Sequence, residues 1–105
     1  MVRGWFVGDF EPSAFRTKNF EVGLLSHKKD EKWPEHFHLK AAEINCLISG
    51  KMKIKGTEIN SGDIFVLEQG EVADPEFLED CSLIVVKTIS DVKDKYEIQH
   101  FQGLS

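Results

Sequence analysis

An all-β fold, built as a sandwich or jelly roll in a single domain, is the fold class that the sequence predicts. Apolar runs of four to eight residues recur along the chain, and Gly, Asn, Asp and Pro separate them at short intervals. No segment shows a convincing helical period. The 105 residues, of which 41% are hydrophobic and 30% charged, suit one globular domain spanning residues 1–105 with a modest core. Two sheets wrapped together would limit the number of exposed strand edges.

The expected strands are short and closely spaced. In chain order they span residues 4–7, 19–28, 35–39, 43–49, 51–55, 57–60, 63–68, 76–79, 82–89 and 95–101. The pairs Lys55-Gly56 and Ser61-Gly62 provide glycines for tight connections between strands. Residues 13–25 have some 3.6-residue periodicity, but Gly23 and the β-branched and aromatic content argue against a helix there.

Charge and hydropathy exclude several classes of function. The formal net charge is −5 and the 13 Lys and Arg residues are scattered, which disfavours nucleic-acid binding. Apolar runs such as 64–67 and 83–86 are too short to cross a bilayer, so we expect no membrane association. The N-terminus has no long apolar run and no small-residue cleavage site, and we expect a cytoplasmic protein.

Two further expectations concern the cysteines and the assembly. Cys46 and Cys81 lie in apolar segments without CxxC spacing, which predicts two reduced thiols in the core. The aromatic-rich segment 4–10 has the character of an edge strand that pairs with a second subunit, and we expect a homodimer.

The candidate metal-binding residues lie in the segment 33–52. Side chains alternate along a strand, so His36 and His38 are expected on one face, about 6.6 Å apart along the strand. Two imidazoles so placed can converge on one ion. A turn at residues 39–42 would begin a second strand with its own register, which adds the carboxylate of Glu43 from the other arm of a hairpin. Ile44, Cys46 and Ile48 then lie on the face opposite Glu43.

The run His36-x-His38-x4-Glu43-x6-Gly50 resembles the first motif of the cupin superfamily, G-x5-H-x-H-x3/4-E-x6-G. Residues 62–70 resemble the start of the second motif, G-x5-P-x-G-x2-H-x3-N. Only 11 residues separate the two motifs, which is typical of the smallest single-domain bacterial cupins. The resemblance covers about residues 20–90 and implies a cupin-type jelly-roll barrel.

The chain departs from both motifs. Asp30 stands where the first motif begins with glycine, Glu68 replaces the proline of the second motif, and Ala73 replaces its histidine. That histidine is usually the fourth protein ligand in metal-bearing cupins. The resemblance therefore implies a metal site of His36, His38 and Glu43, with Asp74 or Glu71 as the replacement for the missing ligand.

The resemblance also implies a function. The expected cofactor is a divalent transition metal (Fe, Mn, Ni or Zn), and the expected activity is that of a metal-dependent enzyme on a small polar metabolite. Sugar or sugar-phosphate-like substrates fit, with isomerase, epimerase or oxygenase chemistry. Glu68 and Glu71 are the candidate catalytic acid/base groups, provided that burial raises a pKa. The alternative is a non-catalytic carbohydrate-binding or accessory protein with a vestigial site.

Overall fold

The computed structural model describes residues 4–32, 36–38, 41–72, 74–90 and 95–97, the segments 36–38 and 95–97 by their backbone alone. These residues form strands and connections without a helix, which confirms the all-β prediction. The strands are β1 (Trp5–Gly8), β2 (Phe15–Arg16), β3 (Glu21–His27), β4 (His36–His38), β5 (Glu43–Ser49), β6 (Lys51–Ile54), β7 (Thr57–Asn60), β8 (Ile64–Leu67), β9 (Glu76–Phe77), β10 (Cys81–Lys87) and β11 (Lys95–Glu97).

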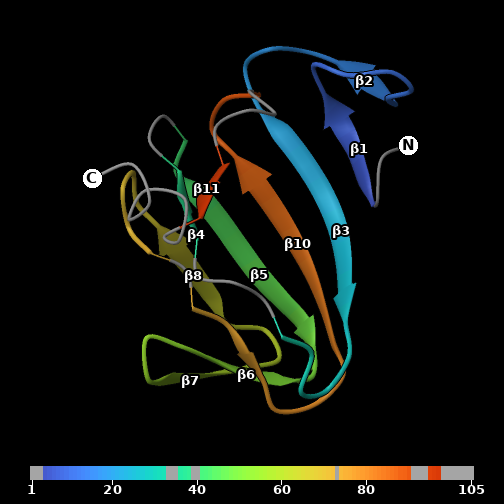
Figure 1. Cartoon of the computed structure of the whole chain (residues 1–105). Coiled ribbons are helices and arrows are strands. Elements are labelled where there is room, and N and C mark those ends of the chain that lie inside the picture. The colour runs from blue at the N-terminus through green and yellow to red at the C-terminus, as the bar shows by residue number, and fades with distance from the viewer. Residues whose placement is uncertain (1–3, 33–35, 39–40, 73, 91–94, 98–105) are drawn as a thin grey trace.

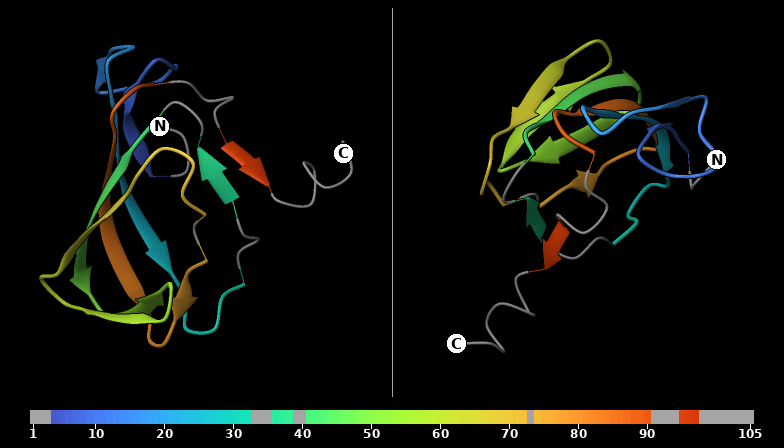
Figure 2. Two further views of the ribbon diagram at one scale, coloured as in Figure 1. Left: turned by 90° about the vertical axis from the view of Figure 1, so that its left-hand side faces the viewer. Right: turned by 90° about the horizontal axis from the view of Figure 1, so that it is seen from above.

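Three sheets make up the fold (Figure 1). The largest has six strands in the order β2-β1-β3-β10-β5-β8, and its pairings are antiparallel except for β1 with β2. A three-stranded sheet, β7-β6-β9, and a two-stranded sheet, β11-β4, complete it. In the two views of Figure 2, β4, β11 and β9 all lie on one side of the six-stranded sheet. The chain therefore folds as a sandwich, in which the described strands of the smaller sheets cover one face of the larger sheet.

The period of two along β5 separates the core from the surface. Leu47 is completely buried and Asn45 is buried beside it, whereas Ile44 and Ile48 are exposed. The core gathers the inward residues of the large sheet and of the small one; it consists of Leu47, Met52, Ile54, Ile59, Leu67, Phe77, Cys81, Leu83 and Val85. The predicted placement of Ile44 and Ile48 opposite Glu43 is confirmed. Burial of this cluster is the main source of stability.

The two cysteines have different surroundings. Both are free thiols, as predicted. Cys81 is part of the core, and burial raises the pKa of its thiol. The prediction of a core position was wrong for Cys46, because its place in β5 turns it to the outer face, where it is half-buried.

The N-terminal strand is not at the sheet edge. β1 pairs with β3 on one side and with β2 on the other, so β2 is the outermost strand. The sequence did not predict β2, because its two residues lack any alternating pattern. The prediction that segment 4–10 forms an edge strand was therefore wrong for β1, whose Val7 and Gly8 are paired with Phe15 and Arg16.

Two positions favour glycine for different physical reasons. Gly50, the last residue of the first motif, has a φ of 101°, and a Cβ there would lie 2.3 Å from the carbonyl oxygen of Asp80. Gly56 has a φ of 77°, but a Cβ there would meet nothing within 4 Å. It follows Lys55, which has a φ of 51°, in the two-residue loop of the β6–β7 hairpin. Two positive φ values in such a loop are typical of a type I′ turn, which makes the tight connection that the sequence predicted here.

This contrast predicts unequal costs of adding a methyl group. Gly56→Ala should lower the free energy of unfolding by about 1 kcal/mol, since only the backbone conformation is disfavoured. Gly50→Ala should lower it by at least ~2 kcal/mol more, because β5 and β10 must also separate. Urea denaturation of both variants measures the difference. Equal losses would mean that the close approach of Asp80 to Gly50 is not a constraint.

Candidate functional site

One end of the six-stranded sheet carries charged residues on its inner face. The pairing register places Lys87 of β10 directly opposite Glu21 of β3 on one side and Glu43 of β5 on the other. These three residues share the inward direction of Leu83, Val85 and Leu47, so they form a charged row at the end of the core. Asn45, buried, lies two residues farther along β5. The predicted ligand Glu43 thus stands on the interior face, in a polar setting.

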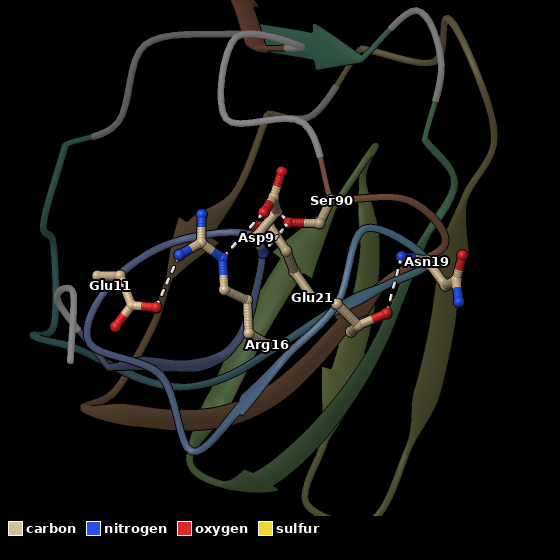
Figure 3. A network of polar contacts seen from close by, with 7 residues as sticks. Asp9, Glu11, Arg16, Asn19, Glu21 and Ser90 are labelled. Carbon is tan, nitrogen blue, oxygen red and sulfur yellow. Dashed lines mark hydrogen bonds and ion pairs between the residues drawn. The ribbon is translucent and has the colours of Figure 1, made fainter.

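A hydrogen-bond network holds this end of the sheet together (Figure 3). The Glu21 side chain is buried, and its carboxylate accepts a hydrogen bond of 2.9 Å from the Ser90 hydroxyl. The Ser90 oxygen in turn accepts one of 2.6 Å from the backbone N–H of Asp9. Lys87 Nζ lies 3.7 Å from the other Glu21 oxygen and 4.9 Å from the centre of the Trp5 ring. These contacts give the buried carboxylate two partners and link the β1–β2 segment to β3 and to the end of β10.

Sequence reasoning missed Glu21, Lys87 and Ser90. A signal was available, because Glu21 opens an apolar strand and Lys87 ends another. Opposite charges at the ends of two buried strands are favourable only when the strands lie side by side. Which strands are neighbours is, however, a property of the topology and not of the local pattern.

The two predicted histidine ligands lie on a short strand, as expected. β4 pairs with β11 so that His36 lies opposite Glu97 and His38 opposite Lys95. The predicted hairpin of β4 with β5 was wrong, because β5 pairs with β10 and β8. β4 instead stands in a separate two-stranded sheet (Figures 1 and 2). The side chains of His36 and His38 lie outside the described residues, as does Ala73.

The carboxylates of the second motif converge on one lysine. The Glu71 carboxylate forms an ion pair with Lys55 Nζ, and Asp74 Oδ1 accepts a 2.9 Å hydrogen bond from the Lys55 backbone N–H. Glu68 and Glu71 close a turn, since the Glu71 N–H donates to the Glu68 carbonyl at 3.0 Å and the Glu71 carboxylate accepts from the Glu68 N–H at 2.8 Å. The structure therefore brings Glu68, Glu71 and Asp74 together at the β6–β7 hairpin.

The surroundings of Glu71 stabilise its ionised form, as expected for a carboxylate in a structural ion pair. Its hydrogen bond with the Lys55 ammonium, followed by that with the Glu68 N–H, lowers the pKa of Glu71 from its ordinary value of 4.5. The acid/base interpretation required a raised pKa, which this environment does not produce for Glu71. Among the described side chains, no group of three or more His, Cys, Asp or Glu residues is arranged to hold a metal ion. Glu43, Glu68, Glu71 and Asp74 thus do not make a centre by themselves.

Asp30 supports the alignment with the first motif. It stands where the motif has its leading glycine, and its φ is 63°, in the left-handed region that glycine favours. Aspartate adopts this region more readily than most other residues. The Asp30 N–H donates a 2.9 Å hydrogen bond to the Phe77 carbonyl, which holds the turn against β9. Asp30 therefore differs from the motif in residue type but has the backbone conformation that glycine favours.

Comparison with solved structures identifies the fold. A double-stranded β-helix domain protein from Klebsiella pneumoniae aligns with a TM-score of 0.69 over 77% of this chain and 71% of its own, at 18% identity. A protein with a cupin-2 domain from Shewanella frigidimarina aligns with a TM-score of 0.54 over 67% of this chain and 71% of its own, at 16% identity. The fold is of the cupin type.

Larger proteins contain the same fold. Oxalate decarboxylase from Bacillus subtilis aligns with a TM-score of 0.70 and 18% identity over 84% of this chain, but the aligned part is only 26% of its own length. No family model matches the chain, and no curated protein matches it in sequence. At 16–18% sequence identity, these similarities show a shared cupin-type fold and nothing beyond the fold. Across the described segments, no helix has the length and apolar character needed to cross a bilayer.

The Lys55–Glu71 pair predicts a pH-dependent contribution to stability. Because the pKa of Glu71 is lowered in the folded protein, the pair stabilises the fold above pH 4.5 and loses this effect as the pH falls through the folded-state value. Glu71→Gln should be less stable than the wild type at pH 7, and the difference should vanish in acid. Urea denaturation between pH 7 and pH 3 tests this.

Glu79→Gln, which removes another exposed carboxylate, is the matched control and should show a difference that changes little with pH. A Glu71→Gln difference that persisted unchanged at pH 3 would contradict the assignment of the ion pair.

Proposed function

We propose that this chain is a metal-binding cupin that acts on a small, polar, anionic metabolite. His36, His38 and Glu43 are the proposed ligands of a divalent transition metal (Fe, Mn, Ni or Zn). The observation that carries the proposal is the position of Glu43 on the interior row of the sheet, directly opposite Lys87 in the pairing register. Charged groups that are turned toward a protein interior are usually paired or coordinate a metal.

The donor set suits such an ion. Two histidines at alternate positions of a strand and one carboxylate supply nitrogen and oxygen ligands of the facial type, which leaves coordination positions open. When bound, the ion polarises a carbonyl or phosphoryl oxygen as a Lewis acid. The oxalate decarboxylase of Bacillus subtilis, which shares the fold, has Mn(II) centres. That likeness supports a metal for this chain but assigns no substrate, and oxalate chemistry is not proposed.

The chain's own residues account for the anionic character of the ligand. Lys87 presents an ammonium group on the inner row, held by Glu21 and the Trp5 ring, so its position is defined before any ligand binds. Such a fixed cation suits a phosphate or carboxylate group. Of the two expected acid/base residues, Glu68 keeps the proposed role, because the pairing of Glu71 with Lys55 stabilises its ionised form. A sugar phosphate has both the polar body and the charge that this arrangement needs.

One observation favours the alternative of a non-catalytic binding or accessory protein. Both candidates for the missing ligand, Glu71 and Asp74, contact Lys55 at the β6–β7 hairpin. In the alternative, these contacts are structural, the metal is lost, and Lys87 alone retains a role in ligand binding. Metal content separates the two functions.

The first test of the proposal is elemental analysis of protein purified without chelator. We expect Fe, Mn, Ni or Zn near one equivalent per chain. His36→Ala and His38→Ala should each weaken metal binding beyond the ~10–100-fold loss that removal of an outer-shell partner causes. His100→Ala, which changes a histidine outside both motifs, is the control and should retain the metal. His27 is unsuitable, because its ring stacks on Phe77 and contacts Glu31. Equal metal content in all variants would refute the site.

The second test restores the motif. Ala73→His should tighten metal binding by at least about tenfold, since an imidazole at the motif's ligand position would replace a labile ligand. The neighbours Glu71 and Asp74 are anchored to Lys55, which holds both flanks of this position in place. Val72→His is the matched control and should leave the affinity unchanged. Competition titration with a chromogenic chelator measures both. Equal or weaker binding in the Ala73→His variant would show that the second motif is misaligned.

A further inference from the structure

The outer face of the six-stranded sheet carries two rows of apolar side chains. The first row follows the pairing register across β3, β10, β5 and β8 and consists of Leu24, Ile84, Cys46 and Ile64. The second row lies beside it on the same strands and consists of Val22, Val86, Ile44 and Val66. Because inward residues of these strands form the core, both rows point away from it. We call these eight residues the outer face.

The outer face is unusually apolar for a protein surface. Ile64 is 66% exposed, Leu24 50%, Val66 46%, Ile84 41% and Ile44 40%, and the adjacent Ile48 is 46% exposed. Together these six side chains expose on the order of 500 Å², near the upper end of the largest apolar patch on a typical monomer. None of the described strands lies over this face in Figure 2. Isolated exposed apolar residues are ordinary, but a continuous patch over four strands marks an interaction surface.

We infer that the outer face is covered by the same face of a second copy of this chain, in a two-fold dimer. The area fits, since a stable interface buries about 800 Å² on each partner, of which roughly two thirds is apolar in homodimers. Two sheets stack face to face about 10 Å apart at about −30°, as in a β-sandwich. Such a contact would bury the outer face of both copies at once.

The chemistry of the face favours a copy over other occupants. A two-fold interface joins the same patch to itself, so any charge at its centre would meet a like charge. The outer face has branched aliphatic side chains and one cysteine thiol, and the next positions on β3 and β10 are serines, Ser26 and Ser82. An anionic membrane is a poor occupant, because the chain carries a net charge of −5 and the face has no basic side chain. The interface thus lies on the sheet face and not at the N-terminal strand.

Light scattering of the wild-type protein at micromolar concentration should give twice the chain mass of 12.0 kDa. The double variant Ile44→Lys/Ile84→Lys places two ammonium groups on the central strands β5 and β10, and should weaken association by roughly a hundredfold or more. Phe15→Lys, at an exposed aromatic residue of β2, is the matched control and should remain a dimer. A monomeric wild type would overturn the proposal, as would a dimer that survives the double variant but is lost in Phe15→Lys.

A second measurement needs no substitution. Cys46 lies within the first row, so the dimer should protect its thiol from alkylation at high protein concentration. On dilution into the monomer range its labelling rate should rise at least about tenfold, while buried Cys81 stays slow throughout. A Cys46 rate that is the same in dimer and monomer would place the interface elsewhere. Because the labelling uses the wild-type chain, it tests the interface independently of any misfolding of the double variant.

Discussion

The antiparallel pairing of β5 with β10 and β8 is the constraint on which the other features of this protein depend. It places Leu47 in the core, Asn45 beside it and Glu43 on the interior row opposite Lys87. The same pairing turns Ile44 and Cys46 outward. A slip of β5 by one residue would exchange its two faces, exposing Leu47 and turning Glu43 away from the interior row. Core, polar interior and outer face are therefore consequences of one register.

Lys55 connects the turn between the two motifs to the acidic part of the second motif. Its positive φ is unfavourable for a side chain that is not glycine. Its backbone N–H and its ammonium group bind Asp74 and Glu71, respectively, which compensates for this conformation. The same contacts give the acidic residues a structural role that competes with the chemical role suggested by their place in the second motif. A motif position therefore indicates where a residue lies more reliably than what it does.

Much of the fold was predictable from local pattern. The bounds of β5 and β7 match the predicted strands, and Lys55-Gly56 forms the predicted tight connection, because alternation and glycine position are local properties. β2 was missed since two residues carry no period. The β4–β5 hairpin was wrongly predicted because closeness in sequence was taken for pairing, whereas β4 finds its partner in β11, more than 50 residues later. Register and turn signals do not specify which distant strand is adjacent.

The sequence by itself determined the all-β class and the cupin-type fold, and it suggested the candidate ligands His36, His38 and Glu43, because these follow from residue type and short-range spacing. It also determined that residues of opposite parity on β5 would face opposite ways. Only the tertiary structure decided which parity is the interior, which carboxylates bind Lys55, and that Glu21, Lys87 and Ser90 meet at the end of the sheet. The interior parity and the meeting at the end of the sheet depend on the pairings of β10 with β5 and with β3, which join residues 33 to 66 positions apart. Such pairings are selected by the burial of the whole core and not by any local pattern.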